Sequence, residues 1–161
     1  MRSKFIAAIV VVLSGTTAVL AQTKFSSTLQ CGKAGGSIEQ HAIEVGDYPN
    51  HSLLIDKSKC TFTKPIEIAG TQSKEEILTE FVEITGTKWR GHGYGFITWA
   101  NGDKSYYSLQ DSGILKDGEP SGEGTWNFTG GTGKLKGIKG KGTYKPGKEA
   151  IEVEGEYELP K

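Results

Sequence analysis

Glu67 and His92 are the two polar side chains of this sequence whose neighbours favour a position beside a cavity. Glu67 lies between Ile66 and Ile68, where a carboxyl group at the mouth of a barrel would act as an acid with a shifted pKa or as a ligand anchor. His92 is flanked by two glycines, which leave room for a molecule close to the imidazole ring. The alternatives are a surface position for Glu67 on an edge strand and a solvated loop position for His92.

Several aromatic residues are spaced to face the interior of a small barrel. The residues that we expect to line a ligand pocket are Tyr94, Phe96, Trp126, Phe128 and Tyr144. Apolar walls with a few polar groups are typical of sites that bind a small apolar or amphipathic molecule. The alternative is an aromatic core, in which large rings pack against small glycines and fill the interior.

The common catalytic and metal-binding patterns are missing from the sequence. The three histidines lie far apart and form no HxH or HExxH motif, so we expect no metal site. No Gly-x-Ser-x-Gly motif marks a serine nucleophile. The glutamates near the C-terminus alternate with apolar residues, which indicates a solvated face rather than paired catalytic carboxylates. We therefore assign no catalytic residue.

Residues 130–134, GGTGK, match the phosphate-binding loop only in part. Phe128 occupies the place of the first glycine, and Leu135 follows the lysine where that motif requires Ser or Thr. No helix is predicted to begin here, so no helix N-terminus would hold a phosphate. We expect a structural turn and no cofactor.

The first 21 residues have the organisation of a secretory signal peptide. Two basic residues precede the apolar residues 5–13, and small residues at 19–21 form a cleavage site. We therefore expect cleavage after Ala21 and a mature chain of residues 22–161, a single domain. A membrane anchor is the alternative, but the apolar run is short for a membrane span. We expect an exported protein, periplasmic or secreted, that has no membrane contact once the signal is removed.

Charge and cysteine content narrow the class of partner. The mature chain has 17 basic and 19 acidic residues, a balance that argues against binding to nucleic acid. Cys31 and Cys60 are an even pair in an exported chain and are expected to form a disulfide; two free thiols are the alternative. Nothing in the sequence specifies an oligomeric state.

The elements that must position these side chains are predicted to be β-strands. In residues 151–159 four glutamates alternate with apolar residues, which is a strand pattern. Residues 122–128 place two glycines, Trp126 and Phe128 on one face, as in strands that bend into a barrel. Asn101-Gly102 predicts a hairpin between residues 94–100 and 104–109. Further segments with strand character are residues 26–29, 37–45, 59–63, 66–68, 81–85, 113–116 and 140–145.

The predicted fold is therefore all-β. Seven to nine short strands, with turn signals every 8–12 residues, are typical of a sandwich or a barrel. Glycines on the apolar faces favour a small closed antiparallel barrel of about eight strands. Ser73 and Glu76 form a capping-box pattern, so we also expect at most one short helix after Ser73.

Two segments carry a resemblance to a known family. Residues 126–134, WNFTGGTGK, with residues 137–144, GIKGKGTY, resemble the closing strands of allene-oxide-cyclase-barrel-like proteins. Residues 60–70, CTFTKPIEIAG, resemble a phrase of small exported bacterial proteins of that type. The resemblance implies an eight-stranded antiparallel barrel with an apolar interior. It brings no catalytic residue to this chain.

The sequence favours a binding or structural role over catalysis. We expect an exported barrel that binds a small apolar or amphipathic molecule or serves as a structural module. The first alternative is an isomerase-like or cyclase-like enzyme that acts in the barrel cavity with Glu67 or His92 as a polar helper. The second is a protein-interaction module with a filled barrel. A cavity of a few hundred Å³ would separate the first two roles from the last.

Overall fold

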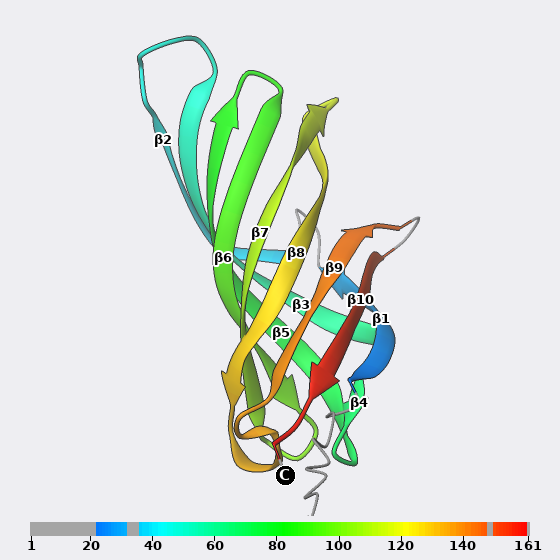
Figure 1. Cartoon of the computed structure of the whole chain (residues 1–161). Helices are drawn as coiled ribbons and strands as arrows, with labels where there is room; N and C mark the ends of the chain where they lie inside the picture. Colours follow the sequence, from blue (N-terminus) through cyan, green and yellow to red (C-terminus); the bar gives the residue numbers. More distant parts are fainter. Residues whose placement is uncertain (1–21, 32–35, 148–149, 161) are drawn as a thin grey trace, which may run out of the picture.

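The computed structural model describes residues 22–31, 36–147 and 150–160, and Figure 1 shows their arrangement. The described residues form ten β-strands and the short 3-10 helix η2 (Gly133–Leu135). The strands are β1 (Thr23–Cys31), β2 (Ser37–Glu44), β3 (His51–Lys64), β4 (Glu67–Ile68), β5 (Thr71–Thr85), β6 (Lys88–Trp99), β7 (Lys104–Lys116), β8 (Glu119–Gly131), β9 (Lys139–Pro146) and β10 (Ile151–Glu158). The predicted signal peptide lies outside the described residues. Within them, no helix is long and apolar enough to cross a membrane.

Eight of the strands close into an antiparallel barrel. Their order is β3-β1-β10-β9-β8-β7-β6-β5, and β5 pairs with β3 to close the ring. This confirms the predicted small closed barrel of about eight strands. The two remaining strands are additions, because β2 pairs with β3 and the two-residue β4 pairs with the start of β5.

The barrel is closed at one end and continues as an open curved sheet at the other. β8 pairs with β7 along its whole length but with β9 only over residues 124–127, so its first residues leave β9. On β3, residues 60–64 pair with β1, whereas residues 52–58 pair with β2. The strands β2, β3, β5, β6, β7 and β8 therefore extend beyond β1, β9 and β10, at the top of Figure 1.

Aromatic rings cover the inward-facing glycines, as the sequence pattern predicts. A Cβ atom at Gly142 would lie 2.6 Å from the ring of Trp126, and one at Gly140 would lie 3.0 Å from the ring of Phe128. The same arrangement places Tyr144 over Gly124, Trp89 over Gly122 and Tyr107 over Gly95. Glycine is required at these positions because any side chain would enter the space that a ring occupies.

A hydrophobic core fills the closed end of the barrel. Leu135 of η2 and Ile138, which follows it, are almost fully buried and pack with Ile68 and Trp99. The indole Nε1 of Trp99 donates a hydrogen bond to Ser105 Oγ at 3.0 Å, so this buried polar group is satisfied. The closed end is thus a conventional core rather than a site.

Residues 130–134 form the structural turn that we expected. The turn leads into η2 and packs against the hairpin between β6 and β7. The backbone N–H of Lys134 donates to Asp103 Oδ2 at 3.0 Å, and the backbone N–H of Lys104 donates to Thr132 Oγ1 at 2.8 Å. These hydrogen bonds fix the position of η2 at the closed end of the barrel.

The predicted short helix after Ser73 is wrong. β5 runs without a break from Thr71 to Thr85 and pairs with both β3 and β6. Two complete ladders of hydrogen bonds outweigh a local capping pattern, since propensity is a weak constraint beside tertiary pairing. The Ser73 hydroxyl instead accepts a hydrogen bond from the backbone N–H of Ile66 at 2.8 Å.

The predicted disulfide between Cys31 and Cys60 is present. It joins residues that lie opposite each other on β1 and β3. The pairing of these two strands involves only residues 28–31 of β1, so the seam where β1 meets β3 is short. The disulfide therefore adds a covalent link where the barrel is closed by few backbone hydrogen bonds.

Candidate ligand cavity

A cavity of about 710 Å³ runs through the middle of the barrel and into the open sheet. Toward the closed end its wall is apolar and includes Ile66, Ile97 and Phe128. Toward the open sheet its wall is again apolar and includes Val82 and Ile84. The volume is within the range of pockets that hold a drug-sized molecule.

Three of the predicted pocket residues line this cavity: Trp126, Phe128 and Tyr144. They come from β8 and β9, and each lies over an inward-facing glycine. The interior is therefore partly filled by rings and partly open, rather than one or the other. This result lies between the two alternatives that the sequence left open.

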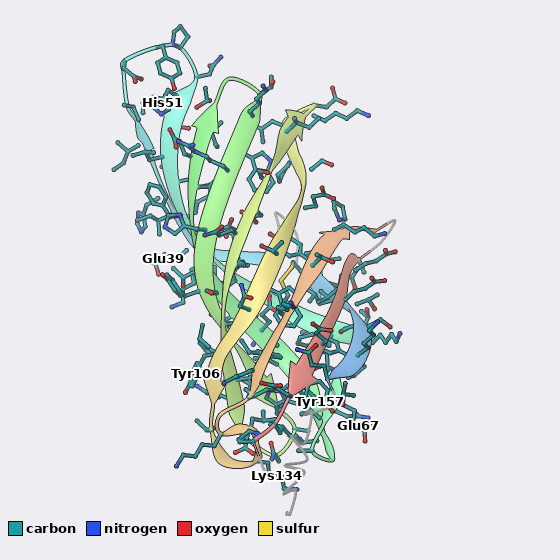
Figure 2. The ribbon with its side chains drawn as sticks, viewed as in Figure 1. Glu39, His51, Glu67, Tyr106, Lys134 and Tyr157 are labelled. Atoms are coloured by element: carbon teal, nitrogen blue, oxygen red, sulfur yellow. A yellow bond between two sulfur atoms is a disulfide. The ribbon has the colours of Figure 1, made fainter. Side chains whose placement is uncertain are left out.

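The other four predicted residues lie outside the cavity, which corrects their assignment to a pocket. Tyr94 is 70% exposed, and the ring of Phe96 carries the Lys104 ammonium 4.4 Å above its centre on the outer surface. His92 is exposed and packs against the outward-facing Phe81. Glu67 is exposed on β4, near the closed end in Figure 2.

Alternation along β6 explains the outward positions of three of these residues. Successive side chains of a strand point to opposite faces of the sheet. Ile97 lines the cavity and therefore faces inward. Phe96, Tyr94 and His92 lie an odd number of positions away from Ile97, so all three face outward. The inward-facing positions between these three residues are Gly93 and Gly95. In the sequence, Gly93 indicated only that there is room beside His92.

The structure places a group of acidic and tyrosine side chains in the middle of the barrel. We call this group the carboxylate–tyrosine cluster; its members are Glu76 and Glu80 of β5, Tyr107 and Asp111 of β7, and Tyr144 of β9. The sequence analysis identified only Tyr144. Alternation would have revealed the glutamates, because Glu76, Leu78, Glu80 and Val82 share one face once β5 is recognised as a strand.

Gly91 brings two of the carboxyl groups together. It lies on β6 between β5 and β7, and a Cβ atom there would collide with Oε1 of Glu80 and lie 2.5 Å from Oδ1 of Asp111. Both carboxyl groups therefore reach over the backbone of Gly91 toward each other. The hydroxyl of Tyr144 donates a hydrogen bond to the other oxygen of Asp111, Oδ2.

Burial and mutual repulsion change the protonation of this cluster. Burial raises the pKa of Glu76 to about 7, and burial together with the neighbouring Asp111 raises the pKa of Glu80 to about 9. Burial and the nearby Glu76 carboxyl hold the pKa of Tyr107 well above its usual range. At neutral pH Glu80 consequently keeps its proton, which Asp111 is placed to share.

Five buried side-chain polar atoms of the described residues have no hydrogen-bond partner. They are Oε1 of Glu80, Nε1 of Trp89, the hydroxyl of Tyr107, Oδ1 of Asp111 and Nε1 of Trp126. All of them belong to the carboxylate–tyrosine cluster or to the cavity wall. The proton on Glu80 bridges two of these atoms, Oε1 of Glu80 and Oδ1 of Asp111. An unpartnered buried polar group costs about 1–3 kcal/mol, so the two indole N–H groups and the Tyr107 hydroxyl call for an occupant that supplies partners.

A second hollow of about 580 Å³ lies beside the cluster, where β8 separates from β9. We call it the side notch; its inner wall contains Asp111 and Tyr144, and its outer wall contains Glu123, Lys145 and Glu152. Tyr144 also lines the main cavity, so the cluster stands between the two hollows. Among the described residues, no group of three or more His, Cys, Asp or Glu side chains is placed to hold a metal ion.

Comparison with known proteins supports the fold and goes no further. No protein-family model matches the chain, and no curated protein matches it. Among solved structures, the chain is similar to the crystal structure of a protein with unknown function from the DUF3224 family of Shewanella oneidensis MR-1. The TM-score is 0.52 at 14% sequence identity, over 88% of this chain and 100% of that one. A likeness at this level of identity shows a shared fold alone.

Proposed function

We propose that this protein binds a small amphipathic molecule in the barrel cavity. The observation that carries the proposal is the presence of unpartnered polar atoms, Nε1 of Trp89 and Trp126 and the hydroxyl of Tyr107, on the wall of a cavity with apolar ends. A purely apolar occupant would leave these atoms unsatisfied, and a purely polar one would leave the apolar walls without contacts. A molecule with an apolar body and one polar group satisfies both.

Direct binding of a fluorescent probe tests this proposal. The probe is N-phenyl-1-naphthylamine, whose fluorescence rises in an apolar site. Val82→Trp places an indole in the apolar part of the cavity and is expected to weaken probe binding at least tenfold. Tyr94→Ala, on the exposed outer face of β6, is the matched control and leaves binding unchanged. Absence of probe binding, or equal binding by the Val82→Trp variant, would overturn the proposal.

A catalytic role is the second candidate, and Glu76 is the residue that favours it. A general acid or base works best with a pKa near the working pH, and burial raises the pKa of Glu76 to about 7 within the cavity. Glu67 and His92 are too exposed to take this part. Mass spectrometry of the molecule that co-purifies with wild type and with Glu76→Gln tests the role. A different molecule in the variant supports chemistry, and the same molecule in both supports binding alone.

We also infer that the protein is exported before it acts. The basic, apolar and small-residue pattern of residues 1–21 supports export, and the Cys31–Cys60 disulfide is stable in an oxidising compartment. Fractionation of cells that express the full chain, with mass spectrometry of the N-terminus, tests this. A mature N-terminus at Gln22 in the exported fraction is the expected result.

The relation to allene-oxide-cyclase-barrel-like proteins is proposed on similar grounds. The sequence motifs of residues 126–144 support it, and an eight-stranded antiparallel barrel is compatible with it. The relation would concern architecture alone.

A further inference from the structure

We propose that the polar group of the ligand is a cationic amine held between the carboxyl groups of Glu80 and Asp111. This inference rests on the proposed ligand cavity and specifies the chemistry of the molecule that fills it. The class of ligand is a primary amine with an alkyl or aryl-alkyl body.

The geometry of the two carboxyl groups matches an ammonium group. Both reach over Gly91, and the buried oxygens Oε1 of Glu80 and Oδ1 of Asp111 have no hydrogen-bond donor apart from the proton that the pair shares. A primary ammonium carries three N–H donors and no acceptor. Hydrogen bonds from an ammonium to a carboxylate are among the strong ones, because both groups carry charge.

Tyr107 provides a second, independent indication of an occupant. It is only 6% exposed and lines the main cavity, and its hydroxyl has no hydrogen-bond partner. The Tyr107 hydroxyl is an acceptor for a further N–H of the ligand. The rings of Trp126 and Phe25, with centres 5.7 Å apart, add aromatic surface to the cavity wall, where the apolar body of the ligand would lie.

The charged groups near the pair are acidic. They are Asp56 of β3 and Glu76 of β5, and the neighbouring hydroxyls of Tyr107 and Tyr144 are neutral because the pKa of each is raised. None of the described residues that line the main cavity is Lys, Arg or His. This field attracts a cation and repels a carboxylate, so a fatty acid is a poor candidate.

The side notch extends the acidic character to the protein surface. Its lining includes Glu123, Glu152 and Glu154, whereas the one cation among the described residues of this lining, Lys145, is paired with Glu152 at 3.5 Å. A cationic head group that approaches from solvent through the notch meets Asp111 and Tyr144 at the inner wall. The side notch and the proposed site are thus both negatively charged, which favours entry of a cation.

Binding of an amine should release a proton. In the ligand-free protein, burial and the neighbouring Asp111 raise the pKa of Glu80 to about 9, so Glu80 keeps its proton near neutral pH. An ammonium between the two carboxyl groups favours the ionised form of Glu80, so the pKa of Glu80 falls and its proton passes to the solvent. The ligand keeps its own charge and no covalent bond changes.

Three ligands with one tail and different head groups test the inference: decylamine, 1-decanol and decanoate. Isothermal titration calorimetry at pH 7.5, in phosphate and in HEPES, gives the affinity and the number of protons released. We expect decylamine to bind at least tenfold more tightly than decanol, with decanoate weakest. About one proton should be released per decylamine bound, and none with decanol.

Glu80→Gln keeps the size of the side chain and removes its charge. It should weaken decylamine binding at least tenfold and abolish proton release, and it should affect decanol binding much less, because decanol carries no charge. Glu67→Gln, a change of the same type at the exposed β4 position, is the matched control and should have no effect. Asp111→Asn provides a second variant if Glu80→Gln does not fold.

Each other outcome separates the two proposals. Equal binding of the three ligands, or decylamine binding without proton release, overturns the amine assignment and leaves the cavity proposal standing. The same holds if none of the three binds while N-phenyl-1-naphthylamine still does. If that probe does not bind either, the cavity proposal itself fails.

Discussion

Gly91 shows how a missing side chain shapes the interior at the scale of single residues. A methyl group at this position would collide with the carboxyl group of Glu80 and crowd that of Asp111. We expect Gly91→Ala to lower the free energy of unfolding by about 1–3 kcal/mol and to weaken decylamine binding more than tenfold. Urea denaturation and calorimetry measure the two effects. Ser112→Ala, at an exposed position beside Asp111, is the control, and equal behaviour of both variants would contradict the role of Gly91.

Protonation of Glu76 and Glu80 gives the ligand-free protein a characteristic pH dependence. The pKa of each is above the ordinary 4.5, at about 7 for Glu76 and about 9 for Glu80, so within these windows the folded state binds more protons than the unfolded chain. Stability is therefore complete below pH 4.5 with respect to these groups and falls as pH rises through 7 and 9. Thermal unfolding between pH 5 and pH 9 should show a melting temperature that declines.

The variant Glu80→Gln isolates one of these groups. It cannot ionise, so its melting temperature should depend less on pH than that of the wild type. At pH 8 we expect it to be more stable than the wild type, because its folding does not require a carboxyl group to take up a proton. A wild-type curve parallel to that of the variant would contradict the assignment. A variant that gains stability while it loses amine affinity would mark Glu80 as a residue kept for binding.

The β2–β3 hairpin has its own pH response at the scale of elements. His51, at the tip of the open sheet in Figure 2, is held by Asp47 at 2.6 Å and Glu83 at 3.2 Å and stacks on Tyr48. The hydrogen bond to Asp47, followed by that to Glu83, raises the pKa of His51 above 6.5. The stabilisation is fully present below pH 6.5 and is lost as pH rises through the raised pKa.

Hydrogen exchange at the backbone N–H of Gly86, which donates to the carbonyl of Asn50 at 2.9 Å, reports on this tip. After correction for the intrinsic rate, we expect less protection at pH 8 than at pH 6. His51→Gln should remove the difference, and His41→Gln, at an exposed position on β2, should retain it. Protection that is equal at both pH values in the wild type would argue against the histidine as a clamp.

Individual strands also show how far the sequence could specify this structure. β10 and β8 were predictable because alternation along them is unbroken, and Asn101-Gly102 fixed the hairpin between β6 and β7. Two features were not predictable by the same means. β5 carries a local helix signal that only its two neighbours override, and the inward positions of β6 are glycines, so its aromatic residues suggested the wrong face.

The candidate site divides in the same way. Trp126, Phe128 and Tyr144 were found because each faces glycines in a recognisable strand. Glu80 and Asp111 come from strands that are adjacent to β6 and meet only across Gly91, a contact between residues far apart in sequence. Local patterns carry no information about such a meeting, which depends on the register of two strand pairs.

The disulfide has its largest effect at the scale of the whole molecule. It joins β1 to β3 at a seam of few backbone pairs, and without that seam the ring of eight strands is open. Replacing Cys31 and Cys60 together by serine should lower the free energy of unfolding by about 3 kcal/mol, from the loss of the closed loop in the unfolded chain. Urea denaturation of the variant and of the reduced wild type measures the change. Identical midpoints for the oxidised and reduced protein would contradict this account.

The separation of β8 from β9 has a consequence for the kind of selectivity that this barrel can exert. The hollow interior meets solvent both along the open sheet and through the side notch, while only the closed end is sealed by a core. A cavity that is open to solvent in two places does not limit the length of the molecule that it binds. Selectivity among ligands would then depend on the head group that contacts the carboxylate–tyrosine cluster. Amines that differ only in the length of the alkyl tail should bind with almost equal affinity.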